Sequence, residues 1–159
     1  MEPVQTTVSL RHTLAALAYR AARALENAPP DFAAFGLGNA PKTPASILAH
    51  MGDLMDWALS LVRGQQKWQN SEPLPWDQEV ARFFAALKAL DDGLAETPVD
   101  SKTANRLFQG PMADALTHTG QIAMLRRLAG CPVKGENYFI ADIQVGSVGL
   151  DQPSPRKAF

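Results

Sequence analysis

Apolar side chains recur at helical spacing in four segments of the chain, at residues 6–27, 43–64, 77–97 and 110–128. In each segment a leucine, isoleucine, phenylalanine or alanine returns every three or four positions, the period of an amphipathic helix. Four helices of roughly 17–22 residues, joined mostly by long connections, are typical of a bundle. The pattern therefore predicts an all-α fold, a four-helix bundle whose long connections allow crossovers.

Proline, glycine and one capping residue set the predicted ends of these helices. Pro30 ends the first helix, and Thr43 followed by Pro44 gives the second an N-cap and a favourable first position. Gly64 ends the second helix, and Pro111 opens the fourth. Three connections are predicted between the helices. The first, at residues 31–42, is an ordered connector, and the second, at residues 65–75, is a polar loop containing tryptophan. The third, at residues 100–110, is a crossover with a helical turn at residues 104–108.

The last part of the chain, residues 134–159, differs in composition from the helical segments. It alternates β-favouring residues such as Tyr138, Ile143 and Val148 with glycine. We expect an extended C-terminal tail that packs on the bundle or on a second subunit. Residues 1–159 are thus interpreted as a single domain, with a bundle core at about residues 5–130.

Composition narrows the function classes. The 159 residues carry a formal net charge of -1, which does not favour a nucleic-acid partner. No apolar run approaches the ~18 residues of a membrane span, and no signal peptide is apparent, so we expect a cytoplasmic protein without membrane association. The single cysteine, Cys131, excludes a zinc site built from several cysteines of one chain, and we expect its thiol to be idle.

The three histidines carry the candidate chemistry. Because a helix turns about 100° per residue, Asp114, His118 and Gln121 share the inward face of their helix with Ile122. His50 lies on the flank of the buried stripe of the second helix. A carboxylate and an imidazole four residues apart, completed by a histidine from a facing helix, would form a three-ligand metal site with open positions. An inward carboxylate at Asp114 needs such compensation, because burying an unpaired charge is costly.

Each of these residues also has a structural interpretation. Asp114 follows Pro111 closely and would favour the dipole of a helix N-terminus, and the two histidines could be hydrogen-bonded parts of the structure. Asp53 is interpreted as a solvated charge, like Asp56, or as a partner that orients His50. His12 falls off the apolar stripe of the first helix and is interpreted as a surface residue.

Three tryptophans gather in or near the second helix and the loop after it: Trp57, Trp68 and Trp76. They either anchor the core and the loop or form the wall of an apolar substrate pocket, Trp57 being the closest in sequence to His50. Gln121 could orient a bound ligand group from the same helix face as His118.

Two segments resemble the DinB-like (damage-inducible) superfamily of four-helix bundle metalloproteins. Residues 47–53 read ILAHMGD, like the first metal-histidine helix of that superfamily, and residues 114–122 read DALTHTGQI before Leu125 and Arg126, like its last core helix. The resemblance covers about residues 5–130. It implies a homodimer with a divalent metal, most often zinc or nickel, held by His50, Asp114 and His118.

The resemblance also implies a small-molecule substrate and thiol-dependent chemistry, because characterised relatives are S-transferases and an isomerase that use a low-molecular-weight thiol. The chain departs from the pattern at Asp114, where the superfamily has a histidine. Two histidines and a carboxylate are still a valid ligand set, and the carboxylate shifts the preference toward harder ions such as manganese or iron. We thus expect a metal-dependent S-transferase or hydrolase. The alternative is a metal-free bundle that binds a small ligand, dimerises or acts in a stress response.

Overall fold

The computed structural model describes residues 3–39 and 42–159, and in these residues the fold is all-α, as predicted, with no strand. The helices, in chain order, are α1 (Pro3–Leu25), α2 (Pro44–Val62), α3 (Trp76–Glu96), α4 (Ser101–Leu107) and α5 (Ala113–Leu128). Three shorter helical segments accompany them: η1 (Phe32–Ala34), the π-helical η2 (Phe108–Met112) and η3 (Tyr138–Ile140).

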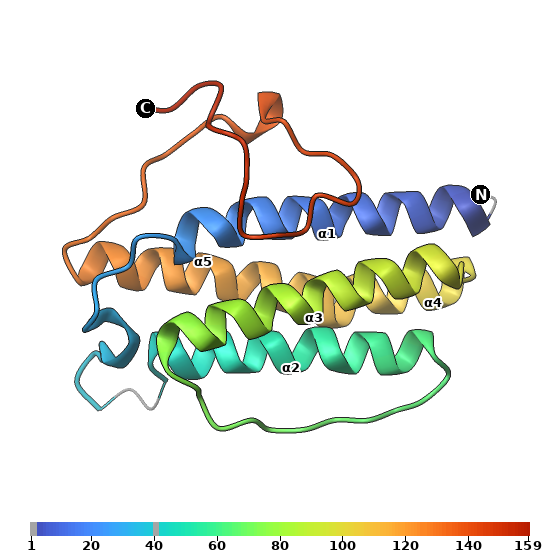
Figure 1. Ribbon diagram of the computed structural model, residues 1–159, viewed down its shortest axis with the longest axis horizontal. Coiled ribbons are helices and arrows are strands. Elements are labelled where there is room, and N and C mark those ends of the chain that lie inside the picture. The colour runs from blue at the N-terminus through green and yellow to red at the C-terminus, as the bar shows by residue number, and fades with distance from the viewer. Residues whose placement is uncertain (1–2, 40–41) are drawn as a thin grey trace.

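The long helices lie side by side with a common apolar core (Figure 1). Helix α1 packs on α3 and α5, and α2 packs on the same two helices. Helices α2 and α3 run in the same direction, so the loop at residues 63–75 returns along the length of α2 before α3 begins (Figure 1). Helices α1 and α5 run the opposite way. This loop therefore lies beside α2 rather than merely linking two adjacent helix ends.

The predicted start of α2 is confirmed in detail. Thr43 is the N-cap, its hydroxyl accepts a hydrogen bond from the backbone N–H of Ser46, and the Ser46 hydroxyl accepts one from the N–H of Thr43. Pro44 occupies the first helical position, where a backbone N–H would have no helical partner in any case. The helix ends at Val62, and Gly64 follows with φ +69°, the left-handed conformation that stops a helix.

The segment before α5 differs from the prediction. We expected a crossover with one helical turn and a new helix at Pro111, but the chain is helical without a break from Ser101 to Leu128. Asp100 caps its start by accepting a hydrogen bond from the Thr103 N–H at 2.7 Å. Pro111 lies inside the π-helical η2, where the N–H of Ala113 bonds to the carbonyl of Phe108, five residues back. The wider turn carries the helix past a residue that has no N–H to donate.

This continuity bears on Asp114. The residue lies inside a long helical stretch whose N-terminus is at Ser101. The unpaired backbone N–H groups that would attract a carboxylate are therefore a long way from it, and the interpretation of Asp114 as a helix N-terminal charge is wrong.

The C-terminal tail packs on α1, as one of the two expectations had it (Figure 1). The hydroxyl of Tyr19 donates to the buried carboxylate of Glu136 at 2.6 Å, the guanidinium of Arg20 stacks on the ring of Tyr138, and Val148 joins the core. The tail forms no strand; an isolated bridge pairs Glu136 with Ala158.

Arg126 ties the ends of α1 and α5 together. It is buried, and its guanidinium donates to the backbone carbonyls of Ala24, Glu26 and Asn27 at the end of α1 and to that of Cys131. A cation there satisfies carbonyls that a helix C-terminus leaves unpaired. Among the described helices, none combines the length and apolar character that crossing a bilayer requires.

Candidate metal centre

The structure brings together the three residues that the sequence pattern selected. His50 from α2 and Asp114 and His118 from α5 place one possible ligand atom each within 4.8 Å of the others. Helices α2 and α5 pack against each other, and the two residues of α5 lie one turn apart on the face toward α2. A metal ion could be held between these three side chains.

Asp114 lies between the two histidines, at a long hydrogen-bond distance from each. The Nε2 atom of His50 lies 3.4 Å from Oδ2 of Asp114, and the Nε2 atom of His118 lies 3.4 Å from Oδ1. Good N–H···O hydrogen bonds are about 2.7–3.2 Å long. Ligands at 2.0–2.1 Å from a tetrahedral ion lie about 3.3 Å from one another. Each histidine lies close to that distance from Asp114, through a different carboxylate oxygen, and the three ligand atoms together fall within 4.8 Å. The donor set and this proximity are compatible with a divalent cation between the three side chains.

Gln121 orients one of the ligands. Its Oε1 atom lies 2.7 Å from Nδ1 of His118, so Nδ1 donates to the amide oxygen, and in the neutral ring this leaves the lone pair on Nε2. A hydrogen bond to the far nitrogen is how metal-binding histidines are commonly fixed. The sequence placed Gln121 on this helix face, and the structure assigns it to His118.

Burial is graded across the three side chains. His118 is 8% exposed, His50 33% and Asp114 46%. Asp114 is thus not the inward carboxylate that we expected: its side chain is half-exposed, although Met112 and Ala115 beside it are buried. The penalty for burying an unpaired charge does not arise, and the same exposure makes the group accessible from solvent.

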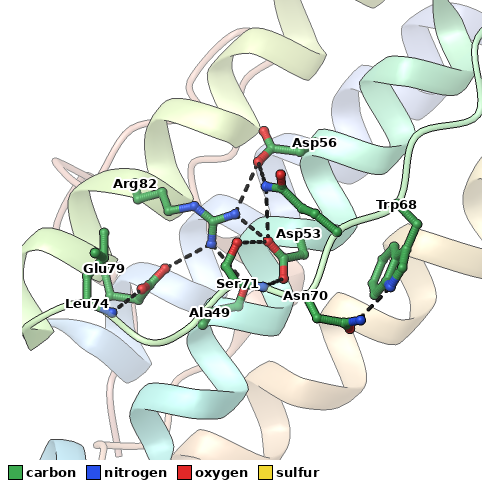
Figure 2. A network of polar contacts seen from close by, with 10 residues as sticks. Ala49, Asp53, Asp56, Trp68, Asn70, Ser71, Leu74, Glu79 and Arg82 are labelled. Atoms are coloured by element: carbon green, nitrogen blue, oxygen red, sulfur yellow. Dashed lines mark hydrogen bonds and ion pairs between the residues drawn. The ribbon is translucent and has the colours of Figure 1, made fainter.

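Asp53 has a different role from either of the two that we predicted. It is 2% exposed, so it is not a solvated charge, and its oxygens bind Arg82 of α3 and both the N–H and the hydroxyl of Ser71 (Figure 2). None of its hydrogen bonds in the described structure goes to His50, which contradicts the prediction that Asp53 orients this histidine. Asp56 is 42% exposed and contacts Arg82 at 3.1 Å.

Arg82 is the centre of this polar network, which we call the Arg82 network (Figure 2). Besides Asp53 and Asp56, its guanidinium binds the fully buried carboxylate of Glu79 and the carbonyl oxygen of Ala49, each at 3.0 Å. The close approach to α2 requires Gly52, because a Cβ atom there would lie 2.6 Å from Nη1 of Arg82. One cation thus balances carboxylates from two helices.

Within this network the two aspartates titrate differently. Burial alone would raise the pKa of Asp53, but the hydrogen bonds from Ser71 and Arg82 favour its ionised form and hold the pKa below the ordinary value. For Asp56, burial outweighs the attraction of Arg82, and the pKa lies above the ordinary value. Asp53 is therefore the carboxylate that the fold holds in its charged state.

The Arg82 network fixes the long loop at residues 63–75 against α2. Asp53 accepts the backbone N–H of Ser71 at 2.8 Å, and Glu79 accepts that of Leu74 at 2.8 Å. Nearer α2's end, the hydroxyl of Ser60 accepts the N–H of Lys67 at 3.1 Å. The loop is thus bonded to α2 and α3 at several points along its length.

The tryptophans differ in role: one packs in the core, and another borders the candidate site. Trp68, in the fixed loop, lies edge-to-face with both Trp57 and His50, with ring centroids 5.7 Å apart in each case. Trp76 instead packs on Phe32 in the core. Trp57 is half-buried and its ring contact is with Trp68, whereas Trp68 also contacts His50 and so borders the candidate site. His12 is exposed on α1, as predicted.

Sequence reasoning missed Arg82, Glu79 and Ser71. A weak signal was present: Glu79 and Arg82 are three residues apart on one helix, and Gly52 lies in the interior of another. No protein-family model, curated protein or solved structure matches the chain. The candidate site therefore has to be judged on its own geometry.

Proposed function

We propose that this protein is a metal-dependent enzyme that acts on a small molecule, with His50, Asp114 and His118 holding one divalent ion. The observation that carries the proposal is the convergence of these three side chains from two helices at ion-bridging distances. Chance clusters of exposed acids are common, but here one histidine is buried and oriented by Gln121. That combination is typical of a functional metal site.

The arrangement of the helices supports the DinB-like interpretation. That superfamily is a four-helix bundle with a crossover connection, and in this chain α2 and α3 are parallel and joined by a loop that returns along the bundle (Figure 1). The residues that resemble the superfamily's metal-binding helices lie on α2 and α5, the two helices that carry the candidate ligands. We propose membership of this superfamily on these grounds.

Two histidines and a carboxylate bind zinc or nickel well and also accept manganese or iron. A bound divalent ion lowers the pKa of a thiol or water and makes it nucleophilic near neutral pH. The residues of the chain would supply orientation and charge. Gln121 holds the proton on Nδ1 of His118, and the negative charge of Asp114 offsets part of the charge of the ion.

Thiol transfer is the reaction that we favour, with a low-molecular-weight thiol as the co-substrate. The exposed parts of His50 and Asp114 leave the site accessible to such a molecule. Hydrolysis would use the same position for water. The two reactions are separated by whether turnover of an electrophilic test substrate requires added thiol.

The remaining parts of the proposal concern the protein's state in the cell. We propose a cytoplasmic homodimer, as the DinB-like resemblance implies. Light scattering at micromolar concentration tests the dimer: twice the mass of 17.2 kDa is expected, and a stable monomer contradicts it.

Metal uptake tests the proposed function. Protein purified without a histidine tag is dialysed against zinc, nickel or manganese, and bound metal is measured by plasma mass spectrometry. We expect about one ion per chain in the wild type and in His12→Ala, whose imidazole is exposed and remote in sequence from the site, and at least a tenfold weaker affinity in His118→Ala. Absence of uptake by the wild type supports the metal-free alternative, a ligand-binding or dimerisation protein. Unchanged uptake by a folded His118→Ala variant contradicts the ligand assignment.

A further inference from the structure

Trp68 lies at the edge of the candidate metal centre, and much of its side-chain surface is not covered by other residues. The residue is 45% exposed although it is large and apolar. Its ring touches His50, which is itself one-third exposed, so the free surfaces of the two side chains adjoin. A molecule bound to an ion at His50 would come within reach of the indole.

The orientation of Trp68 is fixed from several sides. Its indole N–H donates to Oδ1 of Asn70 at 3.2 Å (Figure 2), and Trp57 supports the ring edge-to-face. The loop that carries it is bonded to α2 on either side of Trp68, because the N–H of Lys67 donates to Ser60 and that of Ser71 donates to Asp53. A tryptophan kept for packing alone would not need an exposed surface held in this way.

The bonds that hold the loop come from the Arg82 network. Asp53 and Glu79, both buried and both paired with Arg82, accept backbone N–H groups of the loop at Ser71 and Leu74. This connects the loop to the two helices on which it lies, so Trp68 forms a fixed wall rather than a mobile lid. A fixed apolar wall binds a ligand without the entropy cost of ordering a loop.

We propose that Trp68 is a substrate-contacting residue that determines specificity, and that the molecule acted on carries an aromatic or other flat apolar group beside its metal-binding atom. This inference rests on the proposed function, since it is the bound ion that would hold the substrate beside Trp68. The indole supplies a large apolar surface with a preferred geometry for another ring. Asp53, Glu79 and Arg82 position this wall and do not touch the molecule.

A pair of probes with the same metal-binding head tests the proposal. Acetohydroxamate and benzohydroxamate both chelate divalent ions, and they differ by a methyl against a phenyl group. Their dissociation constants are measured by calorimetry on the zinc-loaded wild type, on Trp68→Ala and on Trp76→Phe. Comparing the ratio of the two constants between variants cancels the intrinsic difference in chelation.

The wild type should favour benzohydroxamate, and Trp68→Ala should reduce this preference by about threefold to tenfold, the usual size of an aromatic contact. Trp76→Phe, altered at a tryptophan that packs on Phe32 in the core, should keep the wild-type ratio. An unchanged ratio in Trp68→Ala with the ion still bound overturns the role of Trp68 and leaves the metal site standing. If the wild type takes up no ion, both proposals fall.

A second measurement covers the case in which Trp68→Ala loses the ion. In the variant Trp57→Phe/Trp76→Phe, Trp68 is the only tryptophan of the chain. Its emission should change on binding of benzohydroxamate and much less with acetohydroxamate. Equal changes with the two probes would show that the phenyl group does not reach the indole, and would overturn the proposal.

Discussion

The Nδ1 atom of His118 lies 2.7 Å from the Oε1 atom of Gln121, and this hydrogen bond leaves the Nε2 atom of the ring facing Asp114. In the neutral imidazole this bond favours the tautomer that keeps Nε2 free to bind an ion. His118 is also the most buried of the three candidate ligands. The affinity of the site should therefore depend on an amide that does not itself touch the ion.

Removing that amide should weaken metal binding. We expect Gln121→Ala to lower zinc affinity about 10- to 100-fold, as loss of a histidine's orienting partner commonly does. Gln121→Glu, which keeps an acceptor, should retain most of the affinity. Both are measured by competition with a chromophoric chelator. Met124→Ala, at an exposed position of the same helix, is the matched control; equal loss in that variant would show that the effect is not specific to Gln121.

Asp114 should set which ion is preferred. Replacing it by histidine, as in Asp114→His, provides a softer ligand in place of a hard carboxylate. The ratio of manganese to zinc affinity should fall by at least tenfold, whereas Asp114→Asn should weaken both ions because the charge is lost. Titration of each apoprotein with the two metals checks this. A ratio that is the same in all three proteins would mean that Asp114 is not a ligand.

Loss of Arg82 should release the loop as well as destabilise the fold. In Arg82→Gln the buried carboxylates of Asp53 and Glu79 lose their cation, which should cost about 2–4 kcal/mol of unfolding free energy. Hydrogen exchange at Ser71 and Leu74 should quicken, because their N–H groups bond to those carboxylates. If the protein is destabilised but exchange in the loop is unaltered, the loop is held by other contacts.

Two glycine substitutions should have opposite signs. In Gly52→Ala the new methyl group meets a guanidinium that is held by its acceptors, so we expect a loss of about 1–3 kcal/mol in unfolding free energy. Gly120→Ala adds a methyl group at an open position of α5 and should gain up to about 1 kcal/mol from helix propensity. Chemical denaturation measures both. A neutral Gly52→Ala would show that Arg82 does not need its close approach to α2.

Acid should act on the fold partly through Asp53. Because its pKa in the native state lies below the ordinary value of 3.8, its contribution to stability is complete above pH 3.8 and is lost as the pH falls through the lowered native pKa. Asp53→Asn should therefore show a shallower loss of stability below pH 4. The pKa of Asp56 is raised instead, so Asp56→Asn should lose stability below pH 4 as steeply as the wild type does. Denaturation midpoints between pH 2 and 6 compare them.

Local signals in the sequence predicted the features that depend on neighbours along the chain. Thr43 and Pro44 show where α2 begins because a helix cap is formed by residues that are adjacent in the sequence. The i, i+4 spacing puts Asp114 and His118 on one face in any helix, and a histidine such as His50 on the packed side of another helix can then complete the group.

Features that depend on the path of the chain in space were missed. Asp53 looked like a surface charge because its partners, Ser71 and Arg82, are 18 and 29 residues away. Pro111 looked like a helix start because a π-helical turn is the rarer way to accommodate proline. The half-exposure of Asp114 depends on which neighbouring elements cover its side of α5, which periodicity along one helix does not reveal.

The position of a bound ion tests the account most directly. Anomalous scattering at the zinc edge from a crystal of the zinc-loaded protein locates the metal independently of any assumption about its ligands. We expect one peak, at about 2.0–2.3 Å from Nε2 of His50, Nε2 of His118 and a carboxylate oxygen of Asp114. A zinc-loaded crystal with no peak there, or with its peak at other residues, would contradict the central claim.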